Sequence, residues 1–293
     1  MQLNSNIADY LVIVAGSPRG GVRTWKTIQK HVLQPLDADL AICCSDEWNQ
    51  DSLLFKLAKY KWIFEEYEDY SNYYSTRFEG TWREFFELGR ETGLYTSGML
   101  QFAKKDIIKN NYLEIIKKYK YIIYTRFDQY HVKDHPKLYE NEILIPEGED
   151  YDGLCDRHTA FPSEYAEKFF DLCTFVDLEK ALSLKVKIYN SESIFLNHLK
   201  HENLLEKVRR TKRSQFTVNL KGEHTNWRIS TYRLYFYKKL MIKYPEEFIV
   251  SIKNLINSNK RLLIGNFRLL INYIYLMIRR KIGFLKNNIL QRK

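Results

Sequence analysis

Apolar residues along this chain form two alternating patterns, short continuous runs and stripes at helical spacing. The continuous runs at 10–15, 39–44 and 121–124 predict buried parallel strands, because such strands are covered on both faces. Helical spacing at 22–33 and 99–118 predicts the connecting helices. A strand, a glycine turn, a helix and a second strand form a βαβ unit, which implies a right-handed parallel crossover. We therefore predict an α/β fold, with a Rossmann-type, mostly parallel sheet flanked by helices.

The remaining segments add shorter elements and a tail. In chain order they are predicted as a helix at 52–74, a strand at 141–146, a helix at 163–182 capped by Ser163, a helix at 191–201 capped by Ser191, and a basic extended segment at 209–223. From Arg228 onward the pattern is helical and basic. We therefore predict a domain at 1–228 and a basic amphipathic helical tail at 229–293.

The charge of the chain is strongly asymmetric. The net charge is +10, but residues 200–293 alone carry a balance of +17, and residues 1–199 a balance of −7. A basic segment of this size predicts an anionic partner, which is a phospholipid surface, a nucleic acid or a charged substrate.

The cysteines and the N-terminus bear on the compartment. No Cys-x-x-Cys pair occurs, and adjacent Cys43 and Cys44 suit neither a disulfide nor a zinc site. Together with Cys155 and Cys173 they are predicted to be reduced, mostly buried thiols. Residues 1–16 lack the basic start and the long apolar run of a signal peptide. These features predict a cytoplasmic protein.

The strand predicted at 121–124 is followed by a charged pair. Arg126 and Asp128 are two residues apart, so an extended chain points both side chains to the same face. A carboxylate at the carboxyl end of a central strand lies where open α/β sheets bind ligands. A divalent metal held there can carry a diphosphate. The other interpretation is a structural ion pair at the end of a strand.

The turn after the first strand, Gly16-Ser-Pro-Arg-Gly-Gly-Val-Arg-Thr24, is a candidate phosphate site. Glycines let the backbone approach a ligand closely, and a helix N-terminus favours phosphate. Arg19 and Arg23 add bidentate donors. The spacing is neither Gly-x-Gly-x-x-Gly nor a P-loop, which argues against a dinucleotide or ATPase site. The alternative is a tight turn whose arginines are solvated.

Later segments contain residues suited to acid–base or ligand chemistry. The polar loop 151–157 offers Asp152 and Asp156 as hydrogen-bond acceptors. Glu192 lies at the start of a predicted helix, where a side chain is held rigidly and where burial can raise the pKa of a carboxylate toward neutrality. Acids are also common at helix starts because they complement the dipole. His224 lies in a later polar segment, and an exposed loop histidine is its other interpretation.

Taken in order, these segments resemble a group of GT-A-fold glycosyltransferases found in bacterial surface-glycan clusters and in large DNA viruses. The resemblance is carried by Tyr-x-Tyr-Ile-Ile-x-x-Arg-x-Asp at 119–128, in which Arg-x-Asp stands in for Asp-x-Asp, and by the glycine–arginine turn. It spans residues 10–228 and implies that 1–228 is a GT-A-like catalytic domain. The implied reaction moves a sugar from a nucleotide-sugar donor to a glycan or lipid-linked acceptor.

The resemblance also implies roles for single residues. The residues that line the nucleotide would be Gly16, Arg19, Arg23 and Thr24. The diphosphate would be held by Arg126 and Asp128 together with Mn²⁺ or Mg²⁺, and the protein ligands of that metal ion would be Asp128 and His224. The donor sugar would lie over Gly153 beside Asp152, Asp156 and Arg157, and Glu192, or else Asp156 or Asp152, would deprotonate the acceptor hydroxyl. That last role applies if the reaction inverts the sugar configuration. A retaining enzyme needs no base at the same place, and the sequence is compatible with both.

The tail carries an apolar stripe at 262–285 that is interrupted by Arg268 and accompanied by Arg279, Arg280 and Lys281. The apolar span is shorter than the ~20 residues that cross a bilayer. It suits a helix lying in a membrane interface with its arginines on lipid phosphates. It equally suits a C-terminal helix packed on the domain. The first interpretation predicts an enzyme peripheral on the cytoplasmic face of a membrane, in the host cytoplasm if the protein is viral.

Two other functions are compatible with the sequence. A nucleotidyltransferase of similar fold would use a glycine-rich loop that contains a lysine, whereas the basic residues of the loop at 16–24 are both arginines. A non-catalytic nucleic-acid-binding protein would bind through the basic segment at 200–293, and its affinity for nucleic acid would fall steeply as the salt concentration rises. We expect no nucleic-acid partner.

Overall fold

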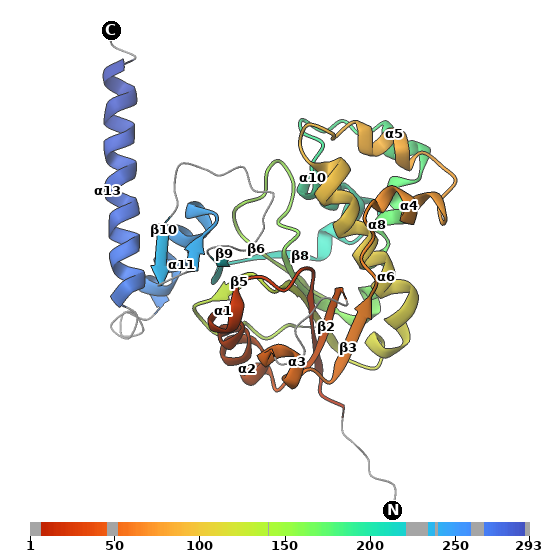
Figure 1. Ribbon diagram of the computed structural model, residues 1–293, viewed down its shortest axis with the longest axis horizontal. Helices are drawn as coiled ribbons and strands as arrows, with labels where there is room; N and C mark the ends of the chain where they lie inside the picture. The colour runs from red at the N-terminus through yellow and green to blue at the C-terminus, as the bar shows by residue number, and fades with distance from the viewer. Residues whose placement is uncertain are drawn as a thin grey trace, which may run out of the picture.

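The computed structural model describes residues 7–45, 52–139, 141–220, 234–237, 240–258 and 267–290. Among these residues, seven strands form a main sheet in the order β3-β2-β1-β4-β7-β6-β8 (Figure 1). Their bounds are β1 Tyr10–Ala15, β2 Asp39–Ser45, β3 Tyr60–Phe64, β4 Tyr121–Arg126, β6 Ile143–Pro146, β7 His158–Pro162 and β8 Val208–Thr211.

Strand β1 lies in the middle of the parallel part of this sheet. It pairs in parallel with β2 on one side and with β4 on the other, and β3 continues the parallel part beyond β2. Strand β7 is antiparallel to both β4 and β6, and β8 pairs in parallel with β6. The predicted α/β class, with a mostly parallel sheet flanked by helices, is therefore confirmed.

Two helical layers cover the two faces of the main sheet (Figure 1). Along β1, Val12 and Val14 belong to one apolar core, whereas Leu11 and Ile13 belong to the other, as strand alternation requires. The first core is closed by α1 Gly21–Ile28, the π-helical turn Gln29–Leu33, α2 Gln34–Leu36 and α3 Leu53–Leu57. The second is closed by α4 Tyr70–Ser75, α5 Trp82–Glu87, α6 Met99–Ile116, α7 Ala166–Phe170, α8 Leu172–Val176, α9 Glu179–Leu182 and α10 Ser191–His201. The four cysteines are free and buried, as predicted.

Three predicted helical features are wrong. The segment 52–74 contains β3, because its aromatic residues pair with β2 as an edge strand. The segment 163–182 is divided into short helices, since the backbone at Asp171 leaves the helical conformation, and Ser163 makes no capping hydrogen bond. Helix α10 is confirmed, but its cap is Asn190: the Asn190 side chain accepts from the Ser193 amide, and the Ser193 hydroxyl accepts from the Asn190 amide.

A smaller sheet follows the main one. In the described residues its order is β10-β11-β9-β5, with β5 Gln129–His131, β9 Gln215–Leu220, β10 Leu234–Tyr237 and β11 Leu240–Ile242. Helices α11 Pro245–Ser258 and α13 Phe267–Leu290 pack on it (Figure 1). The prediction of a wholly helical tail is wrong at β10 and β11, because β10 pairs with β11 and β11 pairs with β9, and Leu240 and Ile242 of β11 join a third apolar core. The predicted boundary at 228 lies outside the described residues, between strands of one sheet.

Candidate functional site

The carboxyl ends of β1 and β4 meet at a topological switch point. Ala15, the last residue of β1, is the parallel partner of Arg126, the last residue of β4. Strands β2 and β3 extend the sheet on the other side of β1. Open α/β sheets bind ligands at such points. The structure therefore brings together the glycine turn after β1 and the Arg126–Asp128 segment after β4.

The glycine turn has a backbone that other residues adopt at a cost. Gly16 has φ 106° and Gly20 has φ 87°, both in the left-handed region. Gly21 also approaches β9 closely, since a Cβ there would lie 2.6 Å from Cδ1 of Leu220. Thr24 is buried, and its hydroxyl donates to the carbonyl of Gly20 at 2.8 Å. Thr24 therefore stabilises the start of α1, and its hydroxyl is already committed there.

The two arginines of this segment lie in different surroundings. Arg19 is partly buried, and its positive charge contributes to lowering the pKa of Asp128, which follows β4. Arg23 is exposed and lines a cavity of about 540 Å³, whose other lining residues include Lys26 and Lys30 of α1. The structure thus associates Arg19, and not Arg23, with the switch point.

Arg126 and Asp128 form a bidentate ion pair. Nε of Arg126 donates to Oδ1 of Asp128 at 3.1 Å, and Nη2 donates to Oδ2 at 2.7 Å. Asp128 is only 2% exposed. Burial alone would favour the neutral carboxyl, but the charges of Arg126, Lys243 and Arg19 outweigh it and lower the pKa of Asp128. The predicted same-face pair is therefore present, with an ionised carboxylate.

Lys243, which the sequence did not single out, adds a cation at this place. Its backbone amide donates to the carbonyl of Thr217 at 2.9 Å, which fixes the residue beside β9. Burial and then repulsion by Arg126 lower the pKa of Lys243 to about 7, against the attraction of Asp128. A bound anion would relieve this repulsion, so the region favours a negatively charged ligand.

The carboxylate of Asp128 is the candidate metal ligand at the switch point. Within the described residues, no group of three or more His, Cys, Asp or Glu side chains is arranged to hold a metal ion, and His224 lies outside them. Mg²⁺ commonly uses one or two carboxylates and completes its shell with water and substrate phosphates. Both oxygens of Asp128 already accept from Arg126. Asp128 therefore does not form a metal site by itself, and a cation here would need most of its ligands from a substrate and water.

The loop at 150–157 packs directly against the start of α10. A Cβ on Gly153 would lie 2.0 Å from the carbonyl oxygen of Glu192, so glycine is required for this approach. The amide of Leu154 donates to the same oxygen at 3.1 Å. Asp156 is buried, whereas Asp152 is exposed, with Lys187 4.0 Å away. Gly153 and Asp156 therefore lie near Glu192, whereas Asp152 is on the surface.

Glu192 has the properties expected of a general base. It lies in the first turn of α10, and Nη2 of Arg157 donates to its Oε1 at 2.9 Å. Burial and then the charge of Asp156 raise the pKa of Glu192 to about 7, although Arg157 acts in the opposite direction. A pKa near neutrality suits proton abstraction at neutral pH.

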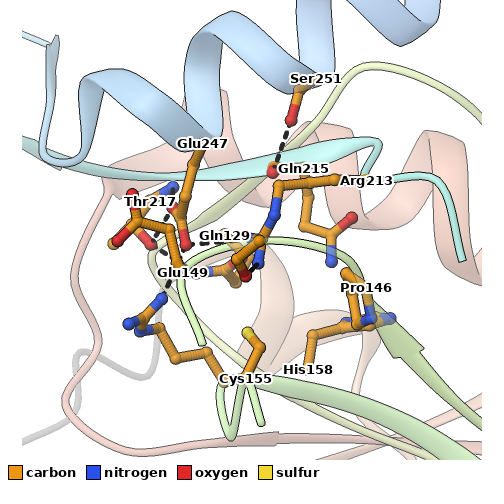
Figure 2. Close-up of polar contacts among 12 residues, drawn as sticks. Gln129, Pro146, Glu149, Cys155, His158, Arg213, Gln215, Thr217, Glu247 and Ser251 are labelled. Atoms are coloured by element: carbon orange, nitrogen blue, oxygen red, sulfur yellow. Dashed lines mark hydrogen bonds and ion pairs between the residues drawn. The ribbon is translucent and has the colours of Figure 1, made fainter. Parts of the chain in front are cut away.

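Arg157 is held from its other side by Glu247 of α11. Nη1 of Arg157 and Nη1 of Arg213 donate to the same Oε1 of Glu247, at 2.8 and 3.0 Å. Oε2 of Glu247 accepts from the amide and the hydroxyl of Thr217, both at 2.7 Å. Figure 2 shows Glu247 pointing from α11 toward Thr217 and Arg213, with Ser251 donating to the backbone of Gln215 beside it. These contacts fix the guanidinium that bonds Glu192.

Sequence reasoning missed Glu247 and Lys243 because both lie in the segment predicted as tail. The start of α11 has a readable signature, Pro245 followed by Glu246 and Glu247, which is typical of a first helical turn. That signature gives the helix but not the partner, since Arg157 is 90 residues away. Comparison with known proteins gives this chain no family, since no protein-family model and no curated protein matches it.

Proposed function

We propose that this protein is a glycosyltransferase, which moves a sugar from a nucleotide-diphosphate-sugar donor to a glycan or lipid-linked acceptor. The observation that carries the proposal is the switch point itself. There, Arg19, Arg126 and Lys243 surround the ionised Asp128. The positive charge of Arg157 acts to lower the pKa of both Arg126 and Glu192. Arg157 therefore lies between this cationic region and a candidate base.

The cationic groups would bind the diphosphate and stabilise its departure. Negative charge develops on the leaving diphosphate as the bond to the sugar breaks, and fixed positive groups stabilise that charge without reorganisation. Arg126 is oriented for this task by its two bonds to Asp128. Lys243, whose pKa is about 7, would become fully protonated when the anion binds.

Glu192 would take the proton of the acceptor hydroxyl in an inverting reaction. Its carboxylate is partly buried and is held by Arg157 in the first turn of α10. The charge of Asp156 acts on this carboxylate, so both acidic groups would lie near the acceptor hydroxyl, while Gly153 lets the preceding loop pack against the backbone of Glu192. Asp156 is the second candidate for the base.

We also propose that Mn²⁺ or Mg²⁺ assists the reaction. Asp128 would be its protein ligand, and the diphosphate oxygens would supply further ligands. When bound, the cation would neutralise part of the diphosphate charge. Because Arg126 already engages both oxygens of Asp128, we expect donor binding to depend on the metal less than it depends on Asp128.

The location that fits this function is the cytoplasm, at the cytoplasmic face of a membrane. Nucleotide-sugars are charged and soluble, whereas a lipid-linked acceptor is anchored in the bilayer, so the enzyme must meet both. No helix in the described parts of the chain has the length and apolarity needed to cross a bilayer.

The decisive experiment screens nucleotide-sugars for thermal stabilisation of the protein, with and without Mn²⁺. A ligand present at ~100 times its Kd stabilises the folded state by about 2.7 kcal/mol, which gives a clear rise in Tm. We expect one donor to raise the Tm of the unmodified protein. Asp128→Asn, which keeps the shape of the side chain, should remove that rise and abolish sugar transfer.

The matched control removes another carboxylate that pairs with an arginine. Glu142 accepts from Arg209 at 2.9 Å at the edge of the main sheet, and Glu142→Gln should leave both the donor-induced rise and the transfer unchanged. Full transfer by Asp128→Asn would refute the assignment. Stabilisation by a nucleoside triphosphate together with a sugar phosphate, and by no nucleotide-sugar, would indicate a nucleotidyltransferase instead.

A further inference from the structure

Helix α13 has one apolar face that belongs to the core of the protein. Leu269 is 1% exposed and Leu276 is 4% exposed, and both pack in the third apolar core with Phe248 and Ile252 of α11. Residues seven apart lie on the same side of a helix, so these contacts define an inner face. The interpretation of the tail as a helix packed on the domain is therefore correct for this face.

The opposite face of α13 is also apolar, and it is exposed. Five large side chains, spaced three or four residues apart or directly adjacent, form this outer stripe: Phe267 at 66%, Ile271 at 49%, Ile274 at 48%, Tyr275 at 47% and Ile278 at 54% exposed. Isolated apolar residues on a surface are ordinary, but a continuous stripe marks an interaction surface. Figure 1 shows α13 at the periphery of the molecule, with α11 and β10 on its inner side.

The charge around the stripe selects the kind of partner. Arg268 and Arg279 are exposed on the described part of the helix, and residues 200–293 carry a balance of +17. Two copies of this chain would bring like charges together, which disfavours self-association through α13. A nucleic acid would meet the charges but leave the apolar stripe in water. Anionic phospholipid meets both features, because its phosphates attract arginines and its acyl boundary accepts the apolar side chains.

We propose that the outer face of α13 docks on an anionic phospholipid surface, with the helix lying in the plane of the interface. This surface is distinct from the switch-point site, and the proposal does not depend on sugar transfer. If the proposed function also holds, docking would bring the site close to an acceptor anchored in the same bilayer.

Co-sedimentation with vesicles tests this proposal. The full-length protein should bind vesicles of three parts phosphatidylcholine to one part phosphatidylserine, and should bind pure phosphatidylcholine vesicles much less. Replacing two isoleucines of the outer stripe by serine, Ile271→Ser with Ile274→Ser, should weaken binding by about tenfold or more, since each loses apolar contact with the interface. Raising the salt should also weaken binding, because screening shortens the reach of the arginines.

The matched control replaces two apolar residues of similar exposure outside the tail. Leu57 and Leu88 are 40% and 48% exposed, and Leu57→Ser with Leu88→Ser should leave vesicle binding unchanged. Both double variants should keep the Tm of the unmodified protein, because all four side chains are on the surface. Equal binding by the stripe variant and the unmodified protein would refute the proposal. Absence of vesicle binding, with a dimer that the stripe variant loses, would assign the stripe to a second copy instead.

Discussion

Replacing Glu192 by glutamine should lower turnover by about 10²–10⁴-fold, the usual contribution of an acid–base group, while donor binding persists. Glutamine keeps an oxygen that can accept from Arg157, which bonds Glu192 at 2.9 Å, so the start of α10 should stay in place. The variant should therefore retain the donor-induced rise in Tm and lose the reaction. The measurement is a comparison of kcat with the Kd of the donor.

The pH profile gives an independent readout of the same residue. The pKa of Glu192 is raised to about 7 by burial and by the charge of Asp156, and a general base acts only when it is ionised. The kcat/KM of the unmodified protein should therefore rise with pH through about 7 and fall away below it. That limb should be absent from the residual activity of Glu192→Gln.

Two outcomes would change this assignment. If binding and rate fall equally, Glu192 contacts the donor or supports the fold. If the kinetics are unchanged, the base is Asp156, which is buried, or Asp152, which is exposed. Glu202→Gln, at the other end of α10, is the control and should behave like the unmodified protein.

The parts of the fold that follow from sequence are those specified by local pattern. Strands β1, β2 and β4 are continuous apolar runs, and such runs predict strands buried on both faces. The meeting of the glycine turn with Arg126 follows from the same pattern, because parallel strands end at one edge. The sequence does not predict strand β3, because Tyr60–Phe64 mixes apolar and polar residues in an order that suits an edge strand and a helix equally well.

The electrostatics of the site depend on contacts that local pattern does not contain. Arg157 and Glu247 are 90 residues apart, and Lys243 comes near Asp128 only because β11 pairs with β9. The basic and helical character of the tail suggested a separate element. Its first half instead supplies a buried carboxylate and a cation to the α/β domain.

Glu247 should be the residue of this network whose loss most reduces stability. It is 1% exposed and lies between two buried guanidinium groups, those of Arg157 and Arg213. Removing one partner of a buried ion pair leaves uncompensated charge and typically costs about 3–5 kcal/mol. Glu247→Ala should lower the free energy of unfolding by about that amount, seen in urea as a lower midpoint at unchanged slope. Glu246→Ala, at the exposed neighbouring position, should change it by less than about 0.5 kcal/mol.

The pH dependence distinguishes this ionic role of Glu247 from simple packing. Burial would raise its pKa, but Arg157 and Arg213 outweigh burial, so the pKa in the folded protein is lower than the 4.5 of a free glutamate. A lowered pKa contributes stability that is fully present above the unfolded value and is lost as pH falls through the folded value. The difference in unfolding free energy between the unmodified protein and Glu247→Gln should therefore be constant near pH 7 and shrink below about 4.5. A difference that stays the same down to acidic pH would show that the side chain acts by shape and hydrogen bonding alone, and that its charge does not hold Arg157 toward Glu192.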